Sequence, residues 1–269
     1  MFTCPPILPY FTPLPQLSLQ GEANLGIPAW LAAVEADLDK ALASGTPIRQ
    51  VVMGRCCAID SMMEALFELY ELDQTDLTLF ATGGYGRGEL HPFSDVDLLL
   101  LSPNPIDEPL NQKISPFVAK LWDIGIDPAL VVRSVEECDE ACHDDITVAT
   151  SLLEARILAG NIAQAGLPMQ LLNKNWSQTK FYEAKMAEAK ERYLKHNSTE
   201  YNLEPDLKNA PGGLRDIHTV SWISKRYFRV TNLFGLVQQE FITEKEFDEL
   251  QQAEDFLWLI RHHLHKIAK

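Results

Sequence analysis

The chain has 269 residues, of which 46% are hydrophobic and 23% are charged, so it is long enough to bury one large core or two smaller ones. Its 38 acidic and 23 basic residues give a formal net charge of -15, which argues against a protein that grips long nucleic acid, because phosphate backbones are bound by positive surfaces. No apolar run approaches the ~20 residues that a membrane helix requires, so no membrane partner is expected.

The N-terminal segment, residues 1–18, contains five prolines and no lysine or arginine. It therefore does not resemble a signal peptide, and we expect a Pro-rich arm. The five cysteines are odd in number and lack the paired spacing of a secreted disulfide scaffold. These features predict a cytoplasmic location.

The first half of the chain mixes helical and strand patterns. Apolar residues at helical spacing predict helices over 27–43 and 48–72, the second opened by Pro47. Short apolar runs bounded by polar residues or glycine predict strands over 77–81, 96–101 and 129–133, and a helix is expected over 110–122.

Beyond residue 135 the pattern is almost wholly helical. The predicted helices cover 146–159, 181–195, 214–229 and 244–269, with a loop over 196–213. We therefore expect an arm and helix over 1–46, a core with a small mixed sheet over 47–142, and a helical domain over 143–269. The predicted fold class is α+β.

The segment ATGGYGRGELHPFSDVDLLLL, residues 81–101, places two aspartates at the start of the most apolar predicted strand. Because side chains alternate along a strand, Asp95 and Asp97 project to one side and Val96 to the other. Two adjacent carboxylates raise each other's pKa and weaken the fold unless a cation lies between them. Oxygen ligands suit Mg²⁺ together with substrate phosphates, so the pair predicts a site for a metal-bound polyphosphate. The alternative is a solvated strand terminus.

Gly83 and Gly84 directly follow the first predicted strand. Their missing side chains let backbone N–H groups approach phosphate oxygens, and a short helix starting near Tyr85 adds its positive N-terminal end. A simple turn is the alternative. The spacing is not the dinucleotide-binding G-x-G-x-x-G, since Glu89 occupies the third glycine position counted from Gly84, and no G-K-[ST] follows as in a Walker loop.

The order strand, Gly-Gly turn and Asp-x-Asp opening a second strand resembles the nucleotidyltransferase superfamily of the DNA polymerase β type. Three further blocks, TVATSLLEARILAG, YNLEPDLKNAPGGLRDIHTVSWI and FLWLIRHHLH, follow in order. Together the four blocks resemble the N-terminal portion of the bifunctional PII uridylyltransferase/uridylyl-removing enzyme family, from about residue 25 to the end. The resemblance implies a nucleotidyltransferase core over 47–142 and a helical bundle over 143–269 that binds substrate or nucleotide.

The resemblance also implies a reaction, the transfer of UMP from UTP to a tyrosine hydroxyl of the PII nitrogen-regulatory protein. Asp95 and Asp97 would be the catalytic residues and would hold two Mg²⁺ ions for in-line attack, with pyrophosphate as the leaving group. The glycines at 83 and 84 would cradle the phosphates, and Arg87 or Ser94 would reach the β and γ oxygens.

Members of the superfamily usually complete the site with a third carboxylate on the following strand. Asp127, immediately before Pro128, is the nearest candidate for this metal ligand. Relatives commonly carry a Gly-His pair where this chain has Ala129 and Leu130. Asp127 is therefore either a ligand or a turn residue ahead of the strand.

The block NLEPDLKNAPGGLRDIH has two interpretations. In the first, Gly212 and Gly213 precede a helix whose first N–H groups are free to bind an anion. The cationic side chains that would join them are Lys208, Arg215 and His218. In the second, the segment is a Gly-rich joint in which Arg215 pairs with Asp216.

Other clusters are expected to be structural. Cys138, Cys142 and His143 lack a second ligand pair, and the sequence RHHLH at 261–265 lacks a neighbouring carboxylate, so neither is expected to bind a metal. The acidic net charge still leaves room for a local basic patch, formed by Lys225, Arg226 and Arg229.

In the family, the last helix is followed by a metal-dependent hydrolase domain that removes UMP and by ACT domains that respond to glutamine. The sequence stops at Lys269, so neither a uridylyl-removing activity nor a glutamine response is expected from these residues alone. Two alternatives to the uridylyltransferase remain: a related nucleotidyltransferase with another nucleotide or acceptor, and a catalytically silent module that binds nucleotide or PII.

Overall fold

The computed structural model describes residues 26–195 and 206–268, which fall into two compact units. The first comprises the described residues as far as Glu140 together with Glu154–Pro168, and the second comprises Ala141–Leu153 and the described residues from Met169 onward. The predicted Pro-rich arm lies outside the described residues. Among the helices that the structure describes, none combines the length and the apolar character needed to cross a bilayer.

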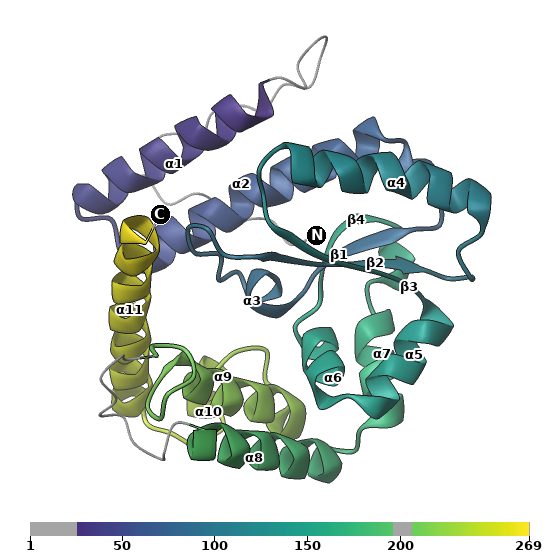
Figure 1. Cartoon of the computed structure of the whole chain (residues 1–269). Helices are drawn as coiled ribbons and strands as arrows, with labels where there is room; N and C mark the ends of the chain where they lie inside the picture. Colours follow the sequence, from purple (N-terminus) through teal and green to yellow (C-terminus); the bar gives the residue numbers. More distant parts are fainter. Residues whose placement is uncertain (1–25, 196–205, 269) are drawn as a thin grey trace. The chain divides into compact units, whose positions relative to one another are not determined.

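The first unit is built on a four-stranded mixed sheet in the order β3-β2-β1-β4 (Figure 1). β1 pairs antiparallel with both β2 and β4, whereas β2 and β3 run parallel. The mixed sheet confirms the predicted α+β class. The strands are β1 (Thr78–Ala81), β2 (Val96–Ser102), β3 (Pro128–Ser134) and β4 (Arg156–Gly160).

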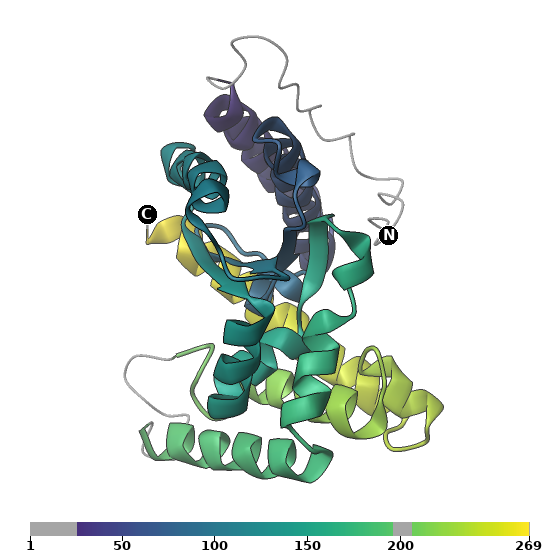
Figure 2. The same cartoon turned by 90° about the vertical axis from the view of Figure 1, so that its right-hand side faces the viewer.

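One face of this sheet is covered by α2 (Ile48–Leu69) and α4 (Glu108–Asp123), as Figures 1 and 2 show. Helix α4 also supplies the crossover that the parallel β2–β3 pair requires. Alternate side chains of β2 pack into the buried cluster under these helices, namely Val96, Leu98 and Leu100. Because side chains alternate along a strand, Asp97 lies on the opposite face of the sheet.

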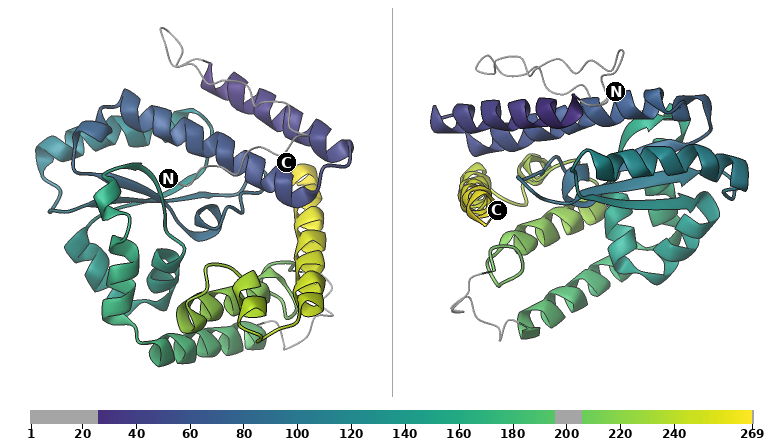
Figure 3. Two further views of the ribbon diagram at one scale, coloured as in Figure 1. Left: turned by 180° about the vertical axis from the view of Figure 1, so that it is seen from behind. Right: turned by 45° about the horizontal axis from the view of Figure 1, so that its top comes forward.

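Helix α1 (Ile27–Ala43) packs along α2, as the right-hand view of Figure 3 shows. A small apolar cluster joins the two helices, formed by Val34, Leu38, Val51 and Ala58. Arg55 of α2 forms a bidentate ion pair with Glu35 of α1, with Nε–Oε1 and Nη2–Oε2 distances of 2.6 and 2.8 Å. The two parallel hydrogen bonds orient the guanidinium and the carboxylate relative to each other. The pair therefore helps to fix how α1 is aligned along α2.

The second unit is helical. Its elements are α6 (Ile146–Leu153), α8 (Gln178–Lys195), α9 (Leu214–Ile223), the π-helical turn η4 (Ser224–Phe228), α10 (Phe234–Gln238) and α11 (Glu244–Ile267). Helix α11 begins with a capping box, in which Thr243 and Glu246 bond each other's backbone N–H groups. Two further helices contain residues of both units, α5 (Val135–Asp144) and α7 (Leu167–Asn175).

Two predicted elements are wrong. The sequence predicts one helix over 146–159, but α6 ends at Leu153 and Arg156–Gly160 forms β4, which pairs with β1. The helix predicted over 214–229 is α-helical only as far as Ile223 and continues as the π-helical turn η4. The segment Glu154–Pro168, which the sequence assigns to the helical domain, therefore belongs to the first unit.

Candidate active site

The C-terminal end of β1 and the N-terminal end of β2 lie side by side in the first unit and bring the glycine turn and the aspartate pair together. Ala81, the last residue of β1, pairs with Leu98, and the Thr82 N–H donates to the Asp97 carbonyl over 3.0 Å. The short helix α3 (Gly83–Gly86) follows at once and so starts two residues before the predicted position. The turn therefore begins beside Asp97.

Gly83 lies directly against the Asp97 side chain. Its φ of +52° is in the left-handed region, which glycine adopts without a steric penalty. A Cβ at this position would stand 3.0 Å from the Asp97 carboxyl carbon and would overlap Oδ2. Glycine is thus needed both for the backbone conformation and for the close approach of the predicted metal ligand.

Asp95 is exposed and Asp97 is half-buried, on either side of the buried Val96. Within the described part of the chain, no lysine or arginine forms an ion pair with Asp95. The Ser94 Oγ beside this pair is buried and has no hydrogen-bond partner among the described residues. Buried hydroxyl groups normally form a hydrogen bond, so one without a protein partner is suited to bonding an oxygen of a ligand.

Asp127 lies in the loop before β3 and is exposed. Its carbonyl accepts the Val96 N–H over 2.8 Å, and the register pairs Asp97 with Ala129, two residues further on. By strand alternation we expect Asp127 on the face of the sheet that carries Asp97. Among the described residues, however, the three carboxylates at 95, 97 and 127 do not form a group whose oxygens all lie within 4.8 Å of one another. The third metal ligand stays a prediction.

Arg87 is held between two carboxylates of its own unit. Its Nη1 donates to Glu154 Oε2 over 2.7 Å and its Nη2 to Glu89 Oε2 over 2.8 Å. Burial lowers the pKa of Arg87, but the two carboxylates outweigh this effect and the net shift is upward. The sequence predicts Arg87 or Ser94 at the β and γ phosphates; the structure places the Arg87 guanidinium between Glu89 and Glu154, beside the glycine turn.

A second polar network lies behind the turn. Asp60 of α2 accepts from Tyr85 Oη over 2.7 Å and from Arg156 Nη1 and Nη2 over 2.7 and 3.0 Å. Burial and the negative charge of Asp60 raise the pKa of Tyr85 well above its usual value, so this hydroxyl remains a donor. Asp60, Glu154 and Arg156 were not among the predicted site residues. The block TSLLEARILAG contains both Glu154 and Arg156, so its two charges within an apolar stretch are the signal that could have identified them.

In the second unit, the N–H groups of the Pro-Gly-Gly segment are already bonded. Gly212 N–H donates to Asp216 Oδ2 over 2.7 Å, and the other oxygen of Asp216 accepts from Arg192 Nη2 over 2.6 Å. These N–H groups are therefore not free to converge on an anion, contrary to the first interpretation, and Asp216 pairs with Arg192 rather than with Arg215. The next three N–H groups, of Gly213, Leu214 and Arg215, donate to the carbonyls of Ala210, Leu207 and Lys208.

Two of the three side chains predicted to join that anion site lie against the ring of Trp222. His218 is buried, with its ring 5.9 Å from the Trp222 ring. The Arg215 guanidinium lies over the Trp222 ring at 5.3 Å, and the Lys185 ammonium lies over it at 4.0 Å. Lys208 is exposed. Trp222 is therefore a common neighbour of Arg215 and His218.

Two family models match the chain. The model described as nucleotidyltransferase domain matches residues 62–152, and the model described as GlnD PII-uridylyltransferase matches residues 180–269. A solved structure described as a toxin-antitoxin with AMP-PNP covers 49% of this chain and 95% of its own, at 15% identity. Its TM-score of 0.28 is too low to support an argument.

Curated relatives match along the whole chain. The bifunctional uridylyltransferase/uridylyl-removing enzyme of Psychrobacter sp. (strain PRwf-1) is 57% identical and covers 100% of this chain and 30% of its own length. Enzymes of the same name from Psychrobacter arcticus and Acinetobacter baumannii are 53% and 47% identical, covering 100% and 89% of this chain. The chain spans 31% and 27% of their lengths, less than a third of either. The chain therefore belongs to the family of the bifunctional uridylyltransferase/uridylyl-removing enzymes and corresponds to their N-terminal, nucleotidyltransferase part.

Proposed function

We propose that the chain transfers UMP from UTP to a tyrosine hydroxyl of the PII signal-transduction protein and releases pyrophosphate. The observation that carries this proposal is the contact between Gly83 and the Asp97 carboxyl group, because it joins a phosphate-binding turn to a metal ligand. The names of the relatives support UMP transfer, and the second family model names PII. The acidic balance of the chain fits a protein acceptor in the cytoplasm better than long nucleic acid.

Asp95 and Asp97 fit a magnesium site. They offer only oxygen donors, Asp97 lies in β2 and Asp95 immediately precedes it, and the unpartnered Ser94 Oγ is next in the chain. When bound, Mg²⁺ would neutralise the triphosphate and lower the pKa of the acceptor hydroxyl. Asp127 is the candidate for a third ligand.

The remaining residues would bind and orient the nucleotide. Gly83 and Gly84 open α3, and the first N–H groups of a helix have no acceptor within it, so they are suited to phosphate oxygens. Ser94 would add a hydroxyl donor. Arg87 would act as a positioning residue, since its contacts with Glu89 and Glu154 hold the turn in place. Such positioning supplies much of the rate of phosphoryl transfer.

The test is incubation of the chain with labelled UTP, Mg²⁺ and purified PII. We expect label on PII, and we expect Asp95→Asn and Asp97→Asn each to reduce it by about 100-fold or more. Asp73→Asn, at an exposed aspartate in the 3-10 turn at Leu72–Gln74, is the matched control and should transfer normally. Label that survives both substitutions would overturn the two-carboxylate mechanism.

Two additional arms test the substrates. Replacement of UTP by ATP, CTP or GTP should abolish transfer if uracil is selected. A PII variant in which the acceptor tyrosine is phenylalanine should remain unlabelled. Transfer to that variant would show that the acceptor is another group.

A further inference from the structure

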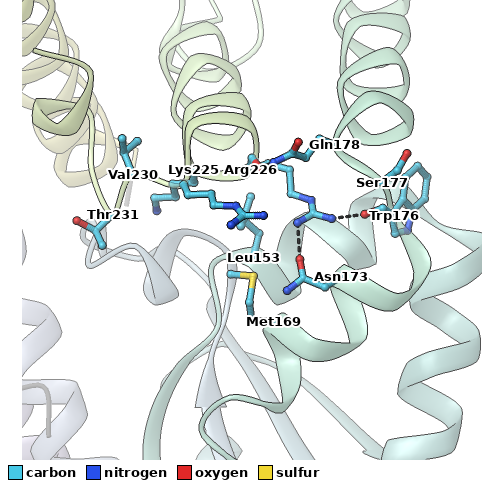
Figure 4. A pocket seen from close by; sticks show the side chains of 11 residues that line it. Leu153, Met169, Asn173, Trp176, Ser177, Gln178, Lys225, Arg226, Val230 and Thr231 are labelled. Carbon is cyan, nitrogen blue, oxygen red and sulfur yellow. Dashed lines mark hydrogen bonds between the residues drawn. The ribbon is translucent and has the colours of Figure 1, made fainter. Parts of the chain in front are cut away.

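A pocket of about 870 Å³ lies within the second unit (Figure 4). Among the residues that the structure describes, three cationic side chains and no acidic one line it. Apolar side chains also line it, among them Leu153, Met169 and Val230. The lining therefore combines positive charge with apolar surface. The cations are Lys225, Arg226 and Arg229.

An unusual backbone presents these cations. Lys225 and Arg226 belong to the π-helical turn η4, and Arg229, which ends it, has a φ of +56° in the left-handed region. Gln178 of α8 holds the turn by donating from Nε2 to the carbonyls of Arg226 and Tyr227 over 3.2 and 3.3 Å. Both π-turns and left-handed non-glycine residues are energetically costly and are concentrated at functional sites.

Arg226 has no counter-charge in the described part of the chain. Its two terminal nitrogens donate to the Asn173 side-chain oxygen and the Trp176 carbonyl, both neutral acceptors, as the dashed lines in Figure 4 show. Its Nε is buried without a partner among the described residues. By contrast, Arg87 and Arg192 each pair with carboxylates. Burial and the neighbouring charge of Arg229 lower the pKa of Arg226, an effect that a bound anion would reverse.

We propose that this pocket binds a small phosphorylated molecule of nucleotide size, with its phosphate at Lys225, Arg226 and Arg229 and its uncharged body against the apolar lining residues. The volume falls within the roughly 300–1,000 Å³ of small-molecule sites, and guanidinium groups match the geometry of phosphate oxygens. The site requires neither a divalent ion nor Asp95 and Asp97. It is thus a binding function beyond the transferase reaction.

The test is calorimetric titration of the 269-residue chain with UMP, and separately with inorganic phosphate, in buffer containing a chelator. We expect UMP to bind more tightly than inorganic phosphate, because only UMP has an uncharged body that can contact the apolar lining residues. Substitution of both Lys225→Gln and Arg229→Gln should weaken UMP binding by about tenfold or more. Arg226 is left intact in this variant because its bonds to Asn173 and Trp176 also hold the fold.

Two control variants define the site. Lys245→Gln removes an exposed charge of α11 that does not line the pocket, and it should bind UMP as the unmodified chain does. A variant with Asp95→Asn and Asp97→Asn should also bind normally. Arg229→Gln alone, at an exposed position, repeats the test if the double pocket variant is unfolded by circular dichroism, with an expected weakening of about threefold.

Four results would overturn the proposal. They are absence of UMP binding at millimolar concentration, unchanged affinity in the pocket variants, tighter binding of inorganic phosphate than of UMP, and loss of binding in the aspartate variant. The last result would assign the nucleotide to the metal site.

Discussion

The Asp97 carboxyl group lies against the backbone of Gly83, so the conformation of the glycine turn and the position of the candidate metal ligand are fixed together. A side chain at residue 83 would meet the carboxylate and would also have to adopt a φ of +52°. The turn and the carboxylate are therefore coupled, although twelve residues of sequence separate Gly84 from Asp97.

Gly83→Ala should reduce UMP transfer by about 100-fold or more, because its Cβ would displace the Asp97 carboxylate from the reacting phosphate. The positive φ should also cost about 1–2 kcal/mol of the free energy of unfolding. Gly88→Ala is the matched control, since Gly88 has a φ of +81° and nothing within 4 Å of a Cβ. Urea unfolding should show similar losses of stability in the two variants. Transfer kinetics should show a loss of activity only in Gly83→Ala. Equal losses of activity in the two variants would contradict the predicted steric clash between a Cβ at residue 83 and the Asp97 carboxylate.

Glu154→Gln should destabilise the first unit by about 2–4 kcal/mol, because it removes the charge of one of the two carboxylates that bind the largely buried Arg87 guanidinium. The turn that Arg87 holds should also shift, so kcat should fall more than the KM for UTP rises. Urea unfolding and steady-state kinetics measure the two effects. The comparison is Glu249→Gln, which breaks an exposed pair with Lys245 and should cost less than about 1 kcal/mol. Losses of the same size in both variants would show that the Arg87 clamp is dispensable.

Alkaline pH should destabilise the protein through Cys56. Burial, reinforced by the negative charge of Asp60, raises the pKa of the Cys56 thiol from 9.0 to about 12. The unfolded chain therefore loses this proton first, so the contribution to stability is complete below pH 9 and is lost as the pH rises from 9 toward 12. The slope in this window should approach about 1.4 kcal/mol per pH unit.

The Cys56 effect is isolated by comparison with Cys56→Ala, which has the same other titrating groups. Between pH 8 and pH 10, urea unfolding should show a loss in the unmodified chain that exceeds the loss in the variant by about 1 kcal/mol. Parallel curves for the two proteins would show that Cys56 is not the titrating group.

Asp216→Ala should open the Pro-Gly-Gly segment locally. The change removes the acceptor of the Gly212 N–H and the partner of Arg192, so amide exchange at Gly212 should accelerate by about tenfold and stability should fall by about 2 kcal/mol. The amides of Gly213 and Leu214 bond to carbonyls and serve as internal references in the same hydrogen-exchange NMR experiment. A uniform acceleration of all three amides would indicate global unfolding instead.

The inner strands of the sheet could be predicted from the sequence, whereas its β4 edge could not. Apart from Asp97, β2 is an apolar run that ends at a polar residue, and the structure places it at Val96–Ser102, one residue longer than predicted. β4 continues the apolar spacing of α6, so its local pattern resembles a helix. Its strand conformation depends on pairing with β1, far earlier in the chain, and tertiary pairing of this kind leaves no local signal.

The residues of the candidate site likewise divide into those that the sequence predicts and those that it does not. Gly83, Gly84, Asp95 and Asp97 lie within one short segment, where turn chemistry and strand alternation predict their neighbourhood. The ion pairs behind them join residues 67 and 96 positions apart, as in Arg87–Glu154 and Asp60–Arg156. Nothing in the spacing of charges along the sequence identifies such partners.

β4 lies at residues 156–160, after the first helices of the second unit, and this position has a practical consequence for producing the first unit by itself. A fragment that stops at residue 142 would lack this strand and would leave β1 with an open edge, whose unpaired N–H and C=O groups favour self-association. A soluble core should therefore be cut no earlier than Pro168, with Ala141–Leu153 retained as an insertion or replaced by a linker.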